Sequence, residues 1–366
     1  MASFWALAVA RDDLSRTALF EGAVPEIGDG EALLRVDRVG LTANNVTYAV
    51  LGESFRYWDF FPAEPGWGHG WGMVPLWGFA DIVASAVADV PVGGRVYGYL
   101  PPASHLVVRP GRADARGFRD ASPHRAQLPS PYNAYALTTG DAAYRADQED
   151  LLILYRPLFF TSFMLADYLQ DNGWFGAEVL VLSSASSKTA YGTAFLLRGK
   201  GPQLVGLTSA GHLAFTESLG CYDRVLPYEA VDQLSVDQLR PAIATAYLDF
   251  AGRADVRGRI RSHLGDRLVH EAVVGVTHQE QAGAQALGGP RTSVFFAPDQ
   301  MRKRSADWGR EGLDSRFAQA WGSFAAAAAE GWVEVVSHRG HDALREVWLE
   351  VLAGRSAPRA GHVVTF

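Results

Sequence analysis

The sequence has only one cysteine, Cys221, in 366 residues. An intramolecular disulfide is therefore excluded, and no cluster of thiolates is available to bind zinc. A reducing compartment is the natural expectation for such a chain. The first residues, MASFWALAVARDDL, are apolar for only a short distance before Arg11, which is too short for a signal peptide. These features predict a cytoplasmic protein.

Long apolar runs and an excess of basic residues are also absent. No apolar stretch approaches the roughly 20 residues that span a bilayer, so no membrane association is expected. The formal net charge is −7, whereas nucleic-acid binding normally requires a basic face that displaces counterions from phosphates. We therefore expect neither a membrane nor a nucleic-acid partner.

The pattern of apolar residues changes near residue 150. Before about residue 130, short apolar runs separated by Gly and Pro predict the strands of a small antiparallel barrel or sandwich. After residue 150, strand and helix patterns alternate, which is typical of a parallel sheet covered on both faces. A helical pattern followed by an apolar strand ends the chain. We expect an α/β protein with residues 1–130 and 335–366 in one domain and residues 150–334 in the other.

Residues 178–198, EVLVLSSASSKTAYGTAFLLR, contain a polar turn without glycine. The apolar run before the turn predicts a buried strand, and Tyr191 and Phe195 after it follow helical spacing. Free amides and the helix dipole at such a junction favour an anion. A P-loop would need glycine at the positions of Leu182 and Ser187. The other phosphate-binding arrangement of this type is the dinucleotide site of a Rossmann βαβ unit.

The segment ASSKTAYGTAFLLR, residues 185–198, resembles the turn A-x-G-G-V-G-x-x-A-x-Q-L-A-K of the zinc-independent medium-chain dehydrogenase/reductases, in their quinone oxidoreductase and enoyl reductase branch. Four further segments of the sequence resemble other segments of that family: EALLRVDRVGLTANNVTYAVLGE, VPVGGRVYGYL, LGCYDRVLPYE and HDALREVWLEVLAGRSAPRAGHVVTF. The resemblance implies a GroES-like β-barrel domain for substrate and a Rossmann-type doubly wound parallel sheet for a dinucleotide. It also implies a reductase of a small apolar carbonyl compound or activated alkene, such as a quinone, enone or enoyl compound. Relatives are often dimers, and the terminal strand HVVTF could pair across such an interface.

The turn departs from this family at Ser187, Lys188 and Ala190, where glycines are usual. Hydroxyl groups of Ser186, Ser187 and Thr189 can donate to phosphate oxygens instead, and the Lys188 ammonium can add a charge. Alternatively, the hydroxyls cap the helix and the lysine is solvated. The missing glycines also favour a second function, in which the same fold has no redox turnover and acts as a lyase, a hydratase or a cofactor-binding protein. The sequence SSKT indicates a third possible function, that of a nucleoside triphosphatase.

The ends of the later strands supply further cofactor candidates. The second strand of the predicted sheet ends in Thr208, Ser209 and His212, with no acidic residue before Glu217. Because a carboxylate at this place binds the ribose hydroxyls of NAD and repels a 2′-phosphate, we expect NADP(H) as the cofactor. The alternative is that Thr208 and Ser209 only begin the next helix. Asp249 and His278 follow other strands and are also cofactor candidates, although Asp249 could be a buried carboxylate that caps a turn.

Catalytic candidates come from the N-terminal part of the chain. No metal is expected, because the zinc-dependent relatives need cysteine ligands there. The resemblance implies that Thr42 and Asn45 lie near the nicotinamide, although adjacent asparagines also favour a helix start. Residues 53–79 contain nine aromatic side chains, which suits an apolar substrate pocket or lid, or a loop packed on the core. Tyr57 in this segment is the candidate proton donor, because a phenol can protonate an enolate or alkoxide.

Overall fold

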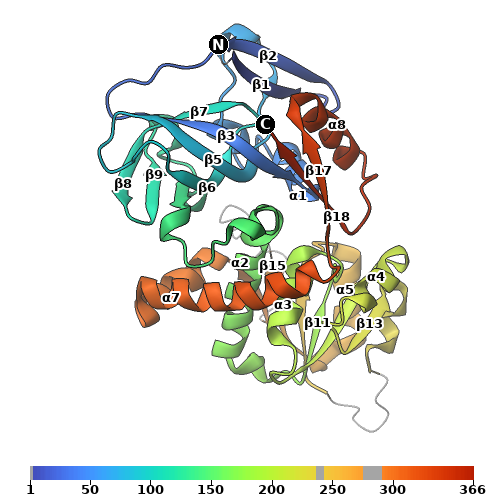
Figure 1. Ribbon diagram of the computed structural model, residues 1–366. Coiled ribbons are helices and arrows are strands. Elements are labelled where there is room, and N and C mark those ends of the chain that lie inside the picture. The colour runs from blue at the N-terminus through green and yellow to red at the C-terminus, as the bar shows by residue number, and fades with distance from the viewer. Residues whose placement is uncertain (1–2, 236–242, 275–290) are drawn as a thin grey trace. The chain divides into compact units, whose positions relative to one another are not determined.

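The computed structural model describes residues 3–235, 243–274 and 291–366 (Figure 1). The described chain divides into two compact units. The first unit comprises Met1–Leu154 and Val333–Phe366, and the second comprises Tyr155–Trp332. Each unit has its own hydrophobic core, and each is described by itself below.

The first unit consists mainly of antiparallel strands. Its larger sheet has the order β17-β18-β3-β5-β6-β10-β9-β8, with β7 also paired to β3, and its smaller sheet has the order β2-β1-β4. The strands are β1 Ser3–Ala10, β2 Thr17–Ala23, β3 Ala32–Leu41, β4 Trp71–Gly72, β5 Leu76–Ser85, β6 Arg95–Leu100, β7 His105–Val108, β8 Pro110–Asp114, β9 Gly117–Asp120, β10 Ala134–Leu137, β17 Glu334–Arg339 and β18 Ala360–Thr365. The helices α1 Ala43–Val50 and α8 Gly340–Leu352 accompany them.

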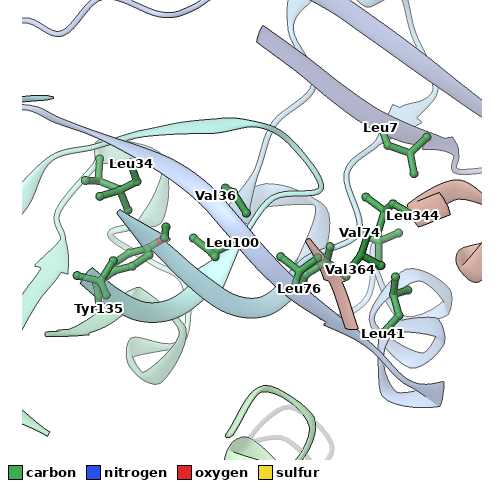
Figure 2. Packing of buried hydrophobic residues seen from close by; sticks show 14 of the residues in the cluster. Leu7, Leu34, Val36, Leu41, Val74, Leu76, Leu100, Tyr135, Leu344 and Val364 are labelled. Carbon is green, nitrogen blue, oxygen red and sulfur yellow. The ribbon is translucent and has the colours of Figure 1, made fainter. Parts of the chain in front are cut away.

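The C-terminal segment completes the core of the first unit. Strand β3 turns Leu34 and Val36 into this core, where they are almost completely buried. Figure 2 shows Val364 of β18 and Leu344 of α8 in the same cluster, beside Leu76 of β5. Burial of these side chains at about 25 cal/mol per Å² of apolar surface holds the chain end on the N-terminal strands.

The second unit contains a parallel sheet with the order β13-β12-β11-β14-β15-β16. Its strands are β11 Val179–Leu182, β12 Gln203–Thr208, β13 Arg224–Pro227, β14 Thr245–Asp249, β15 Leu268–Val274 and β16 Thr292–Phe295. Its helices are α2 Glu149–Asp171, which begins in the first unit, α3 Lys188–Leu197, α4 Leu213–Ser218, α5 Ala254–Leu264 and α7 Ala297–Ala329. The predicted alternation of strands and helices around a parallel sheet is therefore confirmed.

Both faces of this sheet are buried, which explains why its central strand is apolar at every position. Val181 of β11 packs in a cluster with Ile260 of α5, on one face. Leu182, the next residue, is equally buried and points to the opposite face, as alternation in a strand requires. On the helices α2 and α7, Phe159 and Phe324 stack with ring centroids 4.2 Å apart. A helical layer on each side is the arrangement that parallel sheets require.

The strand order determines where a ligand would bind. Numbered along the chain, the six strands lie in the order third, second, first, fourth, fifth and sixth, which is that of dinucleotide-binding sheets. The order reverses between β11 and β14, which are hydrogen-bonded neighbours. In open α/β sheets, ligands bind outside the carboxyl ends of the strands at such a switch point. The candidate edge therefore follows Leu182 and Asp249.

Two expectations from the sequence need correction. The terminal strand β18 is paired on one side with β17 and on the other with β3, so it has no free edge that could pair across a dimer interface. In addition, among the residues described, one helix, Ala146–Asp171, is long and apolar enough by length and composition to cross a membrane. About half of its apolar window, 56%, is buried inside the structure, as in the core helix of a globular domain.

A buried histidine links this fold to pH. His270 on β15 stacks on Phe175 with ring centroids 3.6 Å apart, and its Nε2 lies 3.1 Å from the Ser293 hydroxyl. Burial lowers the pKa of His270 to about 4. The folded protein therefore keeps this imidazole neutral at pH values where an unfolded chain protonates it.

We predict that the free energy of unfolding falls as the pH is lowered from about 6.5 toward 4, by up to about 1.4 kcal/mol per pH unit from this group. The free energy of unfolding falls because His270 takes up a proton in the unfolded state and stays neutral in the folded state over this pH range. The substitution His270→Gln should flatten this part of the profile. Urea unfolding at a series of pH values measures the effect, and parallel profiles for the two proteins would contradict it.

Candidate functional site

The turn between β11 and α3 is built from side-chain hydrogen bonds. Ser184 adopts a left-handed backbone with φ of 49°, a conformation that glycine adopts without cost. The Ser184 amide donates to the Tyr228 hydroxyl at 2.8 Å. The Tyr222 hydroxyl donates to the Ala185 carbonyl at 2.9 Å, and Ser187 caps α3 by accepting from the Ala190 amide at 3.4 Å. Two tyrosines that sequence reasoning missed therefore hold the turn in place.

Asp249 anchors the same turn from β14. Its carboxylate has no exposed surface, and it forms an ion pair with Arg257 of α5 at 2.8 Å. Its other oxygen accepts from the hydroxyls of Ser183 and Tyr247, each at 3.1 Å, and from the amides of residues 251 and 252. This geometry supports the reading of Asp249 as a buried cap, because its oxygens are occupied by protein donors.

The start of α3 nevertheless keeps free donors. In the residues that the structure describes, the amides of Ser186, Lys188 and Thr189 make no hydrogen bond. The Lys188 ammonium has neither a hydrogen bond nor an ion pair there, and lies 5.5 Å from the ring centroid of Tyr155. The side chain is half-buried, and burial lowers the pKa of Lys188 to about 8. Ala190, in contrast, is completely buried and presents no group.

A cation at this place needs an anion. The N-terminus of a helix carries a partial positive charge, so an unpaired ammonium there is unfavourable by itself. A phosphate group bound at the turn would relieve this repulsion and accept from the free amides. The residues of the turn therefore fit the diphosphate of a dinucleotide, and side chains and helix amides would make the contacts that glycine backbone usually makes. Ser187 has φ of −76°, so the second glycine position of a P-loop is not in a left-handed conformation.

The carboxyl end of β12 lies against this turn. Thr208 is almost completely buried, and its hydroxyl donates to the Ser186 hydroxyl at 3.3 Å. The Ser186 hydroxyl lies 3.2 Å from Nδ1 of His212. Ser209 is exposed and begins the following turn, Ala210–His212. The structure therefore brings Ser186 and Thr208 together and adds His212 to them, whereas His278 falls outside the described residues.

In the first unit, Thr42 and Asn45 form the start of α1. The Asn45 carbonyl oxygen accepts from the Thr42 amide at 2.8 Å, and the Asn45 amide group donates to the Pro75 carbonyl at 3.0 Å. Together they make a capping box, which is the helix start that adjacent asparagines favour. Asn45 is almost completely buried. A catalytic role for the two residues stays a prediction.

Tyr57 belongs to a cluster of phenols. Its ring centroid lies 4.6 Å from that of Tyr48 and 6.0 Å from that of Tyr132. The Tyr48 hydroxyl accepts from the Asn44 side chain at 2.7 Å and from the Trp77 indole at 3.3 Å. Burial raises the pKa of Tyr48 and Tyr132 above the usual range of a phenol, so both remain protonated donors. The sequence analysis missed Tyr132, since it lies far along the chain from the aromatic segment.

The described part of the chain contains no group of three His, Cys, Asp or Glu side chains placed to hold a metal ion. His69 is exposed. His105 is buried beside the Ser104 hydroxyl, at 2.9 Å. Neither histidine has a partner set that would suit zinc.

The sequence matches one family model, and the fold matches solved structures over almost the whole chain. A family model described as "Protein of unknown function (DUF2855)" matches residues 39–357. No curated protein matches the sequence significantly. Similar solved structures include CurA from Vibrio vulnificus in complex with NADPH, which is 15% identical with a TM-score of 0.62 and covers 99% of this chain and 98% of that chain.

Two more structures show the same likeness. Mycobacterial Rv1454c complexed with NADPH is 13% identical, with a TM-score of 0.57 over 99% of this chain and 100% of that chain. The quinone oxidoreductase from Coxiella burnetii is 14% identical, with a TM-score of 0.54 over 100% of each chain. Because these likenesses extend over both units, the predicted medium-chain dehydrogenase/reductase fold is confirmed.

We predict that Asp249→Ala lowers the free energy of unfolding by about 3–5 kcal/mol, because Arg257 would keep only its longer contact with Glu271, at 3.4 Å, and the buried hydroxyls of Ser183 and Tyr247 would lose an acceptor. The matched control is Asp255→Ala, which removes a carboxylate that is 62% exposed and pairs with Arg253. An exposed pair contributes about 1 kcal/mol or less. Chemical denaturation of the three proteins measures both losses, and equal losses would show that Asp249 is not an anchor.

Proposed function

Because the chain belongs to the family described as "Protein of unknown function (DUF2855)" and has the fold of the medium-chain dehydrogenase/reductases, we propose that it is an NADPH-dependent reductase. Its substrate class would be a small apolar carbonyl compound or activated alkene, such as a quinone, enone or enoyl compound. We assign cofactor binding to the second unit and substrate binding to the first. CurA and Rv1454c were each solved with NADPH, which supports this choice of cofactor.

The observation that carries the proposal is the Lys188 ammonium, which has neither a hydrogen bond nor an ion pair among the described residues. It lies beside amides that make no hydrogen bond there, at the carboxyl edge of the sheet. An anion with two adjacent phosphate groups satisfies the ammonium and the amides of Ser186, Lys188 and Thr189 together. The Thr189 carbonyl is occupied by the hydroxyls of Ser162 and Thr193, at 2.8 Å each, so this part of α3 is held rigidly. A rigid set of donors lowers the entropy cost of binding.

A bound NADPH would supply a hydride. Tyr57 is the proposed donor of the proton that completes the reduction, and its surroundings are suitable for that role. Burial keeps the neighbouring phenols Tyr48 and Tyr132 protonated, so the cluster offers hydrogen-bond donors to a developing negative charge. The rings of Phe60 and Trp77 pack against the ring of Tyr132, with centroids 5.4 and 5.9 Å away, and this aromatic surface suits an apolar substrate.

One observation favours the second function, in which the same fold acts without redox turnover as a lyase, a hydratase or a cofactor-binding protein. The Ser184 amide, which stands in the turn after β11, is occupied by Tyr228. This amide is therefore lost to a ligand, and the number of backbone donors at the turn is reduced. A protein that binds NADPH and reduces none of a panel of quinones and enones would belong to this class.

We predict that Lys188→Ala weakens NADPH binding at least about tenfold, because a charge-assisted hydrogen bond to phosphate is lost. Lys200→Ala, which removes an exposed lysine after α3, is the matched control and should leave affinity unchanged. Thermal unfolding should change little, since in the described part of the chain the Lys188 ammonium contacts the Tyr155 ring and makes neither a hydrogen bond nor an ion pair. Wild-type affinity should also decline as the pH rises past about 8, where Lys188 loses its proton. Equal affinities for the lysine variants would refute this assignment.

We predict that Tyr57→Phe lowers kcat about 100-fold or more with little change in NADPH affinity, because a general acid acts in the chemical step. Tyr144→Phe is the control, since that hydroxyl donates to Glu149 at 2.9 Å, outside the phenol cluster. The loss of NADPH absorbance with a quinone or enone measures turnover. Full activity of the Tyr57 variant would exclude it as the proton donor.

A further inference from the structure

Three hydrogen-bonding side chains connect the turn between β11 and α3 to the carboxyl end of β12. The Thr208 hydroxyl donates to the Ser186 hydroxyl, which lies 3.2 Å from Nδ1 of His212. His212 is 26 positions after Ser186 in the sequence. The sequence places His212 shortly after this strand, and the structure adds its contact with Ser186.

The hydrogen bonds of this chain of groups favour one form of the imidazole. Ser186 accepts the Thr208 proton, and among the residues described the acceptor for its own proton is His212. We infer the tautomer in which Nδ1 of His212 accepts this proton. In the neutral ring, Nε2 then carries the hydrogen. Nε2 has no protein partner in the described ranges, so it is an available donor.

The position of His212 in the sheet indicates which group of a bound dinucleotide its Nε2 could contact. Residues that follow the second strand of a dinucleotide-binding sheet contact the adenine ribose, and His212 lies in the turn Ala210–His212 that follows this strand, β12. An aspartate or glutamate there accepts from the 2′-hydroxyl of NAD. His212 offers a donor instead, and no carboxylate pairs with it in the described chain. A donor complements the acceptor oxygens of a 2′-phosphate.

We propose that His212 is the specificity residue of the cofactor site, and that it selects NADP(H) over NAD(H) by donating from Nε2 to the 2′-phosphate. Ser186 and Thr208 are positioning residues, which hold the imidazole in its donor form. The inference rests on the proposed function and adds to it the residue that discriminates between the two cofactors.

The experiment measures the dissociation constants of NADPH and NADH for the full chain by calorimetry. The variants are His212→Ala and His212→Glu, and the control is His124→Ala, which alters an exposed histidine of the first unit. Loss of a hydrogen bond to a charged group corresponds to a fold-change of about 10 to 100. We expect His212→Ala to weaken NADPH binding by at least about tenfold and NADH binding by less than about twofold. His212→Glu should reverse the preference.

Thr208→Val tests the positioning role, because valine keeps the shape and removes the hydroxyl. It should reduce the preference for NADPH by less than His212→Ala does, with thermal unfolding unchanged. Adenosine 2′,5′-bisphosphate and 5′-AMP repeat the comparison without the nicotinamide. The same loss of preference for the 2′-phosphate is expected with these two probes.

The outcomes separate this inference from the proposed function. Equal binding of NADPH and NADH by the wild-type protein would overturn the inference and leave the reductase proposal standing. Parallel losses for both cofactors in His212→Ala would also overturn it, because the histidine would then act on the part that both share. If the wild-type protein binds neither cofactor, both proposals are wrong.

Discussion

The buried carboxylate of Asp249 is the constraint on which the candidate site depends. It joins three elements, since it pairs with Arg257 of α5, accepts from Ser183 after β11 and closes the turn after β14. A charge without exposed surface is stable only when its donors are all in place. The network therefore fixes the two strand ends between which the sheet order reverses. The free donors of α3 are held at a defined place for the same reason.

The turn shows how side chains can replace glycine. Glycine lets a phosphate approach the backbone closely, whereas here hydroxyls and phenols complete the turn from within. The cost is a left-handed Ser184, and the hydrogen bond from its amide to Tyr228 offsets part of that cost. Gly192 of α3 has no room for a side chain, because a Cβ there would lie 2.8 Å from the Ser162 hydroxyl. Close packing of α3 on α2 therefore tolerates no side chain, while the turn does.

Three of the residues that the sequence suggested for the site have a structural role in the fold. Thr42 and Asn45 cap α1, and Asp249 caps a turn, so each satisfies backbone groups that would otherwise be unpaired. Tyr57 differs, because it lies among phenols whose hydroxyl groups are held in apolar surroundings. Polar groups concentrated in an apolar cluster are the composition expected of a site for an apolar ligand with an oxygen atom.

The sequence by itself determined the fold class, because apolar runs and helical periodicity indicate which faces of the strands and helices are buried. It also located the strand, turn and helix around Lys188. Only the tertiary structure decided that Tyr228 and His212 meet this turn, that Tyr132 joins Tyr57, and that β18 has no free edge. These contacts join residues far apart in the chain, and periodicity reports only on neighbours within one element. Distant partners become visible only when the strands are placed in order.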